Sequence, residues 1–94
     1  MRKTNIGKFF STSERASIEF DLYLIHNPIT VREYSAKDMT ITLCDDTRIY
    51  FVGLRDERDW NRIAGSEFCY AECYDLDDRT QRYVACRIRR TWYD

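Results

Sequence analysis

Hydrophobic and polar residues alternate most regularly near the C-terminus, over residues 66–75 and again over residues 81–90. Alternation with a period of two is typical of half-buried strands, and the acidic residues 75–80 between the two runs have the composition of a turn. We therefore predict a hairpin with a small-apolar face against a helix and a polar face toward solvent or a partner. The apolar face contains Cys69, Ala71, Cys73, Val84, Cys86 and Ile88; the polar face contains Phe68, Tyr70, Glu72, Tyr74, Tyr83, Ala85, Arg87 and Arg89.

The polar face of this predicted hairpin combines tyrosines with arginines, the residue types enriched at protein-binding hot spots. The same types form stacking platforms for single-stranded nucleic acid. Glu72 in the middle of the face favours a protein partner, and packing of the sheet on both sides, with the tyrosines in the core, stays open as the alternative. The predicted partner-binding residues are Tyr70, Tyr74, Tyr83, Arg87 and Arg89 with the turn acids Asp75, Asp77 and Asp78.

The N-terminal half contains a second alternating run over residues 17–25, which favours a strand. A helix that begins near Ser13 is the competing interpretation, because Ile18, Leu22 and Ile25 would then share one side. His26-Asn27-Pro28 predicts a turn, since proline fixes its own φ and restricts the residue before it. The β-rich residues 29–34 predict a strand paired with the first, and residues 1–13 are predicted to be irregular.

The middle of the chain predicts one further hairpin and one helix. Residues 40–43 and 48–52 are apolar on one face if Ile41 and Leu43 lie opposite Phe51 and Ile49, which requires a loop of three or five residues. Residues 55–64 are the one segment with helical spacing, and Trp60 would pack on the small-apolar face of the C-terminal hairpin. The fold class is therefore α+β: a single domain over residues 1–94, with an antiparallel sheet of about six strands and one short helix on one face.

Composition places the chain among small, folded domains. The 94 residues are 44% hydrophobic and 15% aromatic, with one proline and three glycines, which argues against disorder or a linker. No apolar run approaches a membrane span, and the N-terminus lacks the apolar core of a signal peptide. We expect a cytoplasmic protein whose four cysteines are free, small and mostly buried.

Charge is unevenly distributed although the formal net charge is −1. Residues 16–78 carry fourteen acidic and six basic groups, whereas residues 79–94 carry five arginines and one aspartate. A general attraction for nucleic acid is therefore not expected, but a local one at the basic C-terminus stays open.

No catalytic or metal-binding motif stands out. The cysteines and His26 lack zinc-site spacing, because Cys69 and Cys73 on one strand would lie about 13 Å apart. His26 is the single histidine, and no cysteine or serine is ordered beside it for nucleophilic catalysis. A magnesium site at Asp75, Asp77 and Asp78 rests on a spacing that is too common to be informative. We therefore expect no enzyme, no metal and no cofactor.

One part of the sequence resembles the ATPase domain of phage terminase large subunits. The order RIYFVGL, Gly65, FCYAECYDL and RIRR is similar to that family's hairpin, short helix, acidic strand and following helix. Glu72 would match the catalytic glutamate, whereas Ala71 stands at the magnesium-binding aspartate position and the glycine-rich ATP loop is absent. The resemblance implies a truncated, terminase-ATPase-like fragment without ATP hydrolysis, and it requires residues 79–90 to be helical.

The function predicted from these observations is that of a small, non-enzymatic protein-binding module. A phage- or mobile-element-encoded inhibitor, anti-CRISPR-like, or an accessory protein that occludes a nucleic-acid-processing protein is the specific form we expect. Single-stranded nucleic-acid binding by the Tyr/Arg face is the alternative. Self-pairing into a homodimer through an exposed edge strand also stays open.

Overall fold

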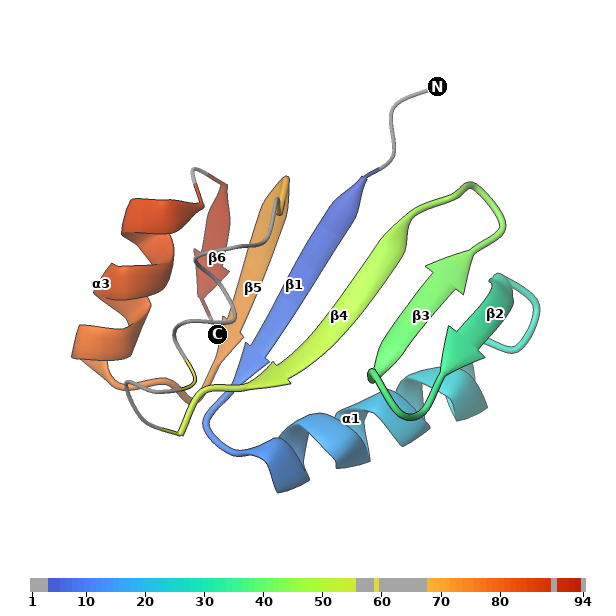
Figure 1. Ribbon diagram of the computed structural model, residues 1–94, viewed down its shortest axis with the longest axis horizontal. Helices are drawn as coiled ribbons and strands as arrows, with labels where there is room; N and C mark the ends of the chain where they lie inside the picture. Colours follow the sequence, from blue (N-terminus) through green and yellow to red (C-terminus); the bar gives the residue numbers. More distant parts are fainter. Residues whose placement is uncertain (1–3, 56–58, 60–67, 89, 94) are drawn as a thin grey trace.

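The computed structural model describes residues 4–55, 59, 68–88 and 90–93, and its α+β class confirms the predicted one (Figure 1). Two helices and six strands follow one another in these residues. In chain order they are β1 (Asn5–Phe10), α1 (Ser13–His26), β2 (Val31–Ser35), β3 (Thr40–Leu43), β4 (Arg48–Gly53), β5 (Tyr70–Tyr74), α3 (Asp78–Arg87) and β6 (Thr91–Tyr93).

The sheet is mixed, which corrects the prediction of an antiparallel sheet. Its strand order is β2-β3-β4-β1-β5-β6. Strand β1 runs parallel to both β4 and β5, and β5 runs parallel to β6, while β2, β3 and β4 are antiparallel neighbours. Parallel neighbours need long connections. The chain between β1 and β4 contains α1, and the chain between β5 and β6 contains α3. The predicted irregular N-terminus is therefore wrong, because it contains the strand in the middle of the sheet.

Helix α1 replaces the strand predicted for residues 17–25 (Figure 1). Thr12 is its N-cap and accepts a hydrogen bond from the amide of Arg15 at 3.1 Å, which satisfies a free amide of the first turn. Ala16 and Phe20 are buried on one side at helical spacing. The alternation that favoured a strand arises because the helix is apolar on two sides, as described below. Asn27 and Pro28 of the predicted turn follow the helix, whereas His26, which was also predicted to lie in the turn, is the last residue of the helix.

Helix α3 replaces the second strand of the predicted C-terminal hairpin. Asp77 is its N-cap and accepts a hydrogen bond from the amide of Thr80 at 2.7 Å. Val84 and Ile88 are buried four residues apart, whereas Cys86 is exposed. Capping and burial at i, i+4 spacing thus decide for a helix where the alternation alone favoured a strand.

The predicted hairpin of residues 40–52 is confirmed, with a different register. Ile41 lies opposite Ile49 rather than Phe51, so the pairing is shifted by two residues and both apolar faces stay on the same side. Leu43 donates its amide to the carbonyl of Thr47 at 2.8 Å, which leaves a loop of three residues, one of the two predicted lengths.

Strand β2, which was predicted at residues 29–34, pairs with β3 through a bulge between Val31 and Glu33. The extra residue of the bulge changes which side chains of β2 point to which side of the sheet. Val31 therefore packs on the same side as Tyr34, whose ring lies 6.2 Å from that of Phe20 of α1. Glu33 points to the other side of the sheet, where it lies opposite Thr42.

Two apolar clusters fill the two sides of the sheet. Adjacent residues Phe9 and Phe10 of β1 belong to different clusters, as expected for a strand whose side chains alternate. The α1 cluster contains Phe10, Ala16, Phe20, Ile41, Ile49 and Phe51. The α3 cluster contains Phe9, Leu54, Ala71, Cys73, Leu76, Val84 and Ile88.

Gly53 at the end of β4 allows the strand to meet the start of α1. A Cβ atom at this position would lie 2.4 Å from the amide nitrogen of Ser13 and 2.5 Å from the carbonyl carbon of Thr12. Backbone atoms cannot yield as a side chain can, so this contact requires glycine. The helix predicted for residues 55–64, with Trp60, lies outside the described residues apart from Arg55 and Asp59.

Candidate protein-binding surface

The structure divides the predicted Tyr/Arg face between the two sides of the sheet. Tyr74 of β5 stacks on Phe10 in the α1 cluster, with ring centroids 5.0 Å apart. Tyr83 of α3 packs against the α3 cluster on the opposite side, and the Arg87 guanidinium lies 5.2 Å from its ring centroid. The prediction of one continuous recognition face is therefore wrong, because residues 81–87 form a helix and not a strand. Tyr70 is half-buried beside Ile6, and Arg89 lies outside the described residues.

The predicted turn acids have structural contacts. Asp75 follows β5 with a φ of 55° and forms an ion pair with Arg15 of α1. Asp77 caps α3, and Asp78 lies in its first turn, where a negative charge interacts favourably with the helix dipole. These contacts explain the acidic composition without a ligand; whether the acids also bind a partner stays a prediction.

The small-apolar face is only partly as predicted. Ala71 and Cys73 are fully buried in the α3 cluster, which confirms their inward orientation. Burial raises the pKa of the Cys73 thiol to about 11. Cys69 is exposed, because β5 begins only at Tyr70, and Cys44 and Cys86 are exposed as well. The expectation of mostly buried cysteines is therefore wrong.

A polar cluster lies between α1 and strands β1 and β5, where a cavity of about 260 Å³ opens. The Lys8 ammonium lies 3.7 Å from the carboxylate of Glu72, which also accepts a hydrogen bond from the Tyr74 hydroxyl. The same ammonium lies 5.1 Å from the ring centroid of Tyr23 and 5.7 Å from that of Phe51, within the range of cation–π attraction.

The charged groups of this cavity satisfy one another, so the cluster orders the sheet beside α1. Burial, followed by the charges of Glu72 and Asp45, raises the pKa of Tyr23. The sequence did not predict this cluster, because Lys8 lies in residues 1–13, which were predicted to be irregular.

Helix α1 carries a second apolar side that faces away from the sheet. Ile18, Leu22 and Ile25 are 56%, 40% and 69% exposed, and Ile29 in the following turn is 89% exposed. Positions i, i+4 and i+7 lie on one side of a helix, so Ile18, Leu22 and Ile25 are neighbours; together with Ile29, which follows the helix, we call them the α1 stripe. The competing helical interpretation of residues 17–25 had aligned three of them.

Charged groups flank the α1 stripe. Glu14 and Asp21 are exposed on its flank, and within the described residues neither forms an ion pair. Glu19 lies on the other flank, 3.4 Å from the Arg15 guanidinium. Leu22 belongs both to the stripe and to the lining of the cavity beside Lys8. The stripe is thus an apolar surface with the exposed acids Glu14 and Asp21 along one flank, which we call the acidic rim.

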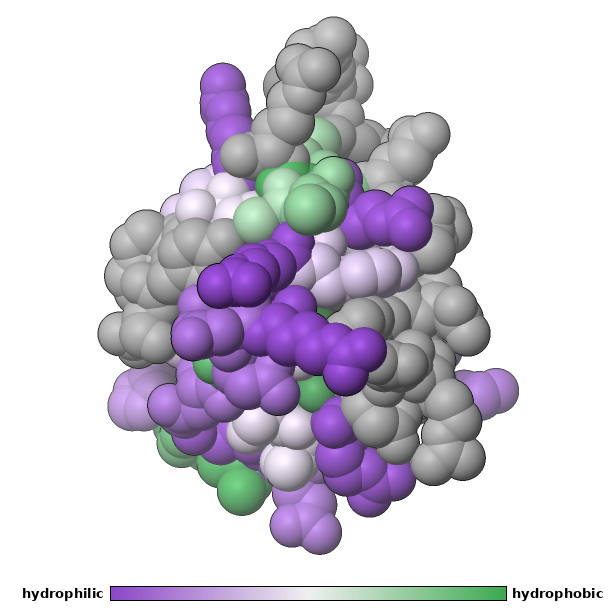
Figure 2. All heavy atoms as spheres, turned by 90° about the vertical axis from the view of Figure 1, so that its left-hand side faces the viewer, coloured by the Kyte–Doolittle hydropathy of each residue, from purple (hydrophilic) through white to green (hydrophobic). Residues whose placement is uncertain are grey.

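The outer side of α3 differs from that of α1. Figure 2 looks onto this end of the molecule, and most of its described atoms belong to hydrophilic residues. Arg79, Arg82 and Arg87 are exposed on α3, together with Arg90 after it. An apolar docking surface is therefore found on α1 and not on α3.

Two features are absent from the described residues. They contain no group of three or more histidine, cysteine, aspartate or glutamate side chains placed to hold a metal ion. Neither of their two helices combines the length and the apolar composition that a membrane-spanning helix needs.

No protein-family model matches the chain, and no curated protein and no solved structure matches it. The resemblance to terminase ATPase domains requires a helix after the acidic strand, and α3 lies there. However, Glu72 is engaged by Lys8 and Tyr74, and the sequence lacks the ATP loop.

Proposed function

We propose that this protein is a binding module that docks on another protein through the α1 stripe. The single observation behind the proposal is the exposure of Ile18, Leu22, Ile25 and Ile29 on one side of the molecule. Scattered apolar residues are normal on a surface, whereas a contiguous set rimmed by polar residues is typical of an interaction site. The binding class is the one predicted from the sequence; the surface is a different one.

The energetics favour a helix or apolar patch of the partner as the occupant. Fully burying an exposed leucine or isoleucine side chain contributes about 1.5–3 kcal/mol, and the α1 stripe contains four such residues that are already partly covered. The gain from the whole stripe therefore has the size needed to offset part of the entropy cost of association. The stripe also matches the i, i+3, i+4, i+7 spacing by which two amphipathic helices pack.

The acidic rim favours a basic partner over a second copy of the chain. If α1 packed antiparallel on α1 of another copy with the two stripes centred on each other, Asp21 would approach its own counterpart, and like charges in an interface are unfavourable. A partner helix whose apolar side is flanked by lysine or arginine would place opposite charges beside Glu14 and Asp21. This complementarity would also accelerate association at low salt.

An inhibitor or accessory protein that acts on a nucleic-acid-processing protein is the specific form of this proposal. Proteins of that class expose lysine and arginine to bind phosphates, which suits an acidic rim. The Tyr/Arg residues of the C-terminus remain the competing surface, for a protein or for single-stranded nucleic acid.

The test is affinity capture from the native host with four forms of the protein: wild type, Ile18→Ala/Ile25→Ala, Tyr70→Ala and Arg87→Glu. We expect one protein that the wild type, Tyr70→Ala and Arg87→Glu forms retain and the double variant loses. Its affinity should fall about tenfold or more in the double variant, because two anchors are truncated. Both alanine changes of the double variant favour the helix, so it should melt like the wild type.

Other outcomes would contradict the proposal. Capture that persists in the double variant but fails in Tyr70→Ala or Arg87→Glu would assign binding to the C-terminal residues, and recovery of nucleic acid alone would indicate the alternative function. A homodimer in light scattering that the double variant abolishes would mean that the stripe pairs with its own copy.

A further inference from the structure

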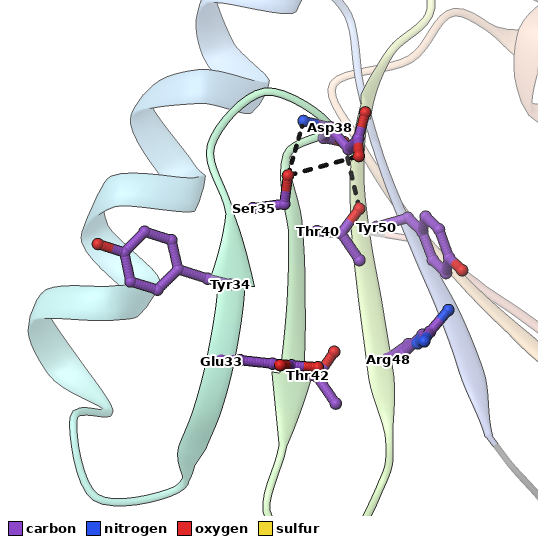
Figure 3. Close-up of a pocket in the computed structure, with 8 residues that line it drawn as sticks. All are labelled: Glu33, Tyr34, Ser35, Asp38, Thr40, Thr42, Arg48 and Tyr50. Carbon is purple, nitrogen blue, oxygen red and sulfur yellow. Dashed lines mark hydrogen bonds between the residues drawn. The ribbon is translucent and has the colours of Figure 1, made fainter.

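A second surface lies on the opposite side of the sheet from α1, over β2, β3 and β4. No described helix covers it, and it contains a cavity of about 640 Å³, a size typical of small-ligand sites. Figure 3 shows the polar side chains that line it, while Tyr34 points away toward α1. This surface shares no side chain with the α1 stripe.

Glu33, Thr42 and Arg48 form one row across the three strands of this surface (Figure 3). The row follows from the register, since Glu33 lies opposite Thr42 and Thr42 lies opposite Arg48. Neighbouring strands are about 4.8 Å apart, so the outer two residues of the row are separated by about 10 Å. A residue with a carboxylate and a residue with a guanidinium therefore lie on the strands to either side of Thr42.

Thr42 in the middle of the row is a buried polar residue whose hydroxyl has no hydrogen-bond partner among the described residues. It is 6% exposed, and no hydrogen bond of its side chain to a described residue is formed. The neighbouring hydroxyls are engaged: Ser35 donates to the Asp38 carboxylate at 3.4 Å, and Thr40 donates to the Asp38 carbonyl at 3.3 Å. Buried polar groups are almost always hydrogen-bonded, so a free one that lines a cavity indicates a missing partner.

The two charged ends of the row are also unpaired. Neither Glu33 nor Arg48 forms an ion pair within the part of the chain that the structure describes, whereas the adjacent Arg32 is held by Asp46. The row thus offers an anion, a hydroxyl and a cation. A ligand that satisfies all three needs a positive group, a negative group and a short distance between them.

We propose that this row binds the ammonium and carboxylate groups of a free α-amino acid. Glu33 accepts hydrogen bonds from the ammonium group, and Arg48 donates two parallel hydrogen bonds to the carboxylate, a geometry that the planar guanidinium favours. The Thr42 hydroxyl donates to the carboxylate from below. The ligand side chain points into the remaining cavity.

The test is an NMR titration of the ¹⁵N-labelled protein with L-alanine and two analogues that each lack one charged group. Ethylamine lacks the carboxylate, and propionate lacks the ammonium. We expect L-alanine to shift the amide signals of Glu33, Thr42 and Arg48 in a saturable manner. Each analogue should bind about tenfold or more weakly, because it leaves one charged residue of the row without a partner.

Variants assign the effect to the row. Arg48→Gln and Thr42→Val should each weaken L-alanine binding, and Thr42→Val should keep the melting temperature because it removes a hydroxyl that has no partner. Lys37→Gln, which removes an exposed positive charge outside the cavity, should bind like the wild type. The proposal is overturned if L-alanine gives no saturable shift, if the analogues bind equally well, or if Arg48→Gln and Thr42→Val bind like the wild type.

Discussion

At the scale of single residues, two capping side chains decide where the helices begin. Thr12 accepts a hydrogen bond from Arg15 at the start of α1, and Asp77 accepts one from Thr80 at the start of α3. Each bond satisfies an amide that the helix itself cannot satisfy. Asp77 adds a charge, so its contribution depends on pH.

The pH dependence of Asp77 has a defined sign. The hydrogen bonds from the Thr80 side chain and amide, helped by the charge of Arg79, lower the pKa of Asp77. A lowered pKa in the folded state means that the stabilisation is present above the ordinary value of about 3.9. It is lost as the pH falls through the lower folded value. Asp77→Asn should therefore match the wild type at pH 7, since asparagine caps equally well.

Thermal melts between pH 7 and pH 2.5 test this expectation. The melting temperature of Asp77→Asn should fall less than that of the wild type over this range. Asp21→Asn is the control, because Asp21 is an exposed acid in the middle of α1 and caps no helix; its curve should run parallel to that of the wild type. Parallel curves for all three proteins would contradict a role of Asp77 in the pH response.

At the scale of elements, α1 has two apolar sides with different purposes. One side contains Ala16 and Phe20, which are buried in the α1 cluster. The other contains the exposed residues of the α1 stripe, which contribute little to folding. Amphipathic helices of soluble domains usually bury one side and expose polar residues on the other. The second apolar side is therefore not needed to stabilise the fold.

Substitutions on the two sides of α1 should differ in stability. Phe20→Ala is expected to lower the free energy of unfolding by about 3–5 kcal/mol, because it leaves a cavity among Phe51, Ile41 and Ile49. Ile25→Ala on the stripe should change it by no more than about 0.5 kcal/mol. Urea denaturation measures both. An equal loss for the two variants would show that the stripe is part of the core.

At the scale of the whole molecule, the sheet separates two cores that share no side chain. The α1 cluster and the α3 cluster lie on opposite sides, and β1 supplies one phenylalanine to each. The two candidate surfaces follow the same division. The α1 stripe lies outside the helix on one side, and the row of Glu33, Thr42 and Arg48 lies on the other, where β2, β3 and β4 have no described helix over them.

Two conservative changes test whether the cores are independent. Ile49→Val in the α1 cluster and Ile88→Val in the α3 cluster should each cost about 0.5–1.5 kcal/mol. Because they have no common neighbour, the double variant should lose the sum of the two within about 0.5 kcal/mol. Chemical denaturation of the four proteins completes the cycle. A larger deviation would mean that the sheet transmits packing changes between its sides.

The sequence by itself determined the features that depend on residues close together along the chain. The hairpin of β3 and β4 is local, so alternation and an odd loop sufficed to predict it. The inward orientation of Ala71 and Cys73 in β5 followed from the same alternation. The α+β class and the absence of a recognisable catalytic motif also came from sequence patterns.

Tertiary structure alone decided what depends on distant partners. Residues 17–25 satisfy both the strand and the helix period, and burial of Phe20 together with Ala16 against the sheet selects the helix. Residues 81–90 are ambiguous in the same way. Because α3 forms there, Tyr74 and Tyr83 lie on opposite sides of the sheet, and the predicted Tyr/Arg face does not form. The row of Glu33, Thr42 and Arg48 needs three strands in register, and the place of β1 needs two parallel neighbours from later in the chain. Long-range pairing carries no local signature, because its energy is realised only when segments far apart in sequence meet.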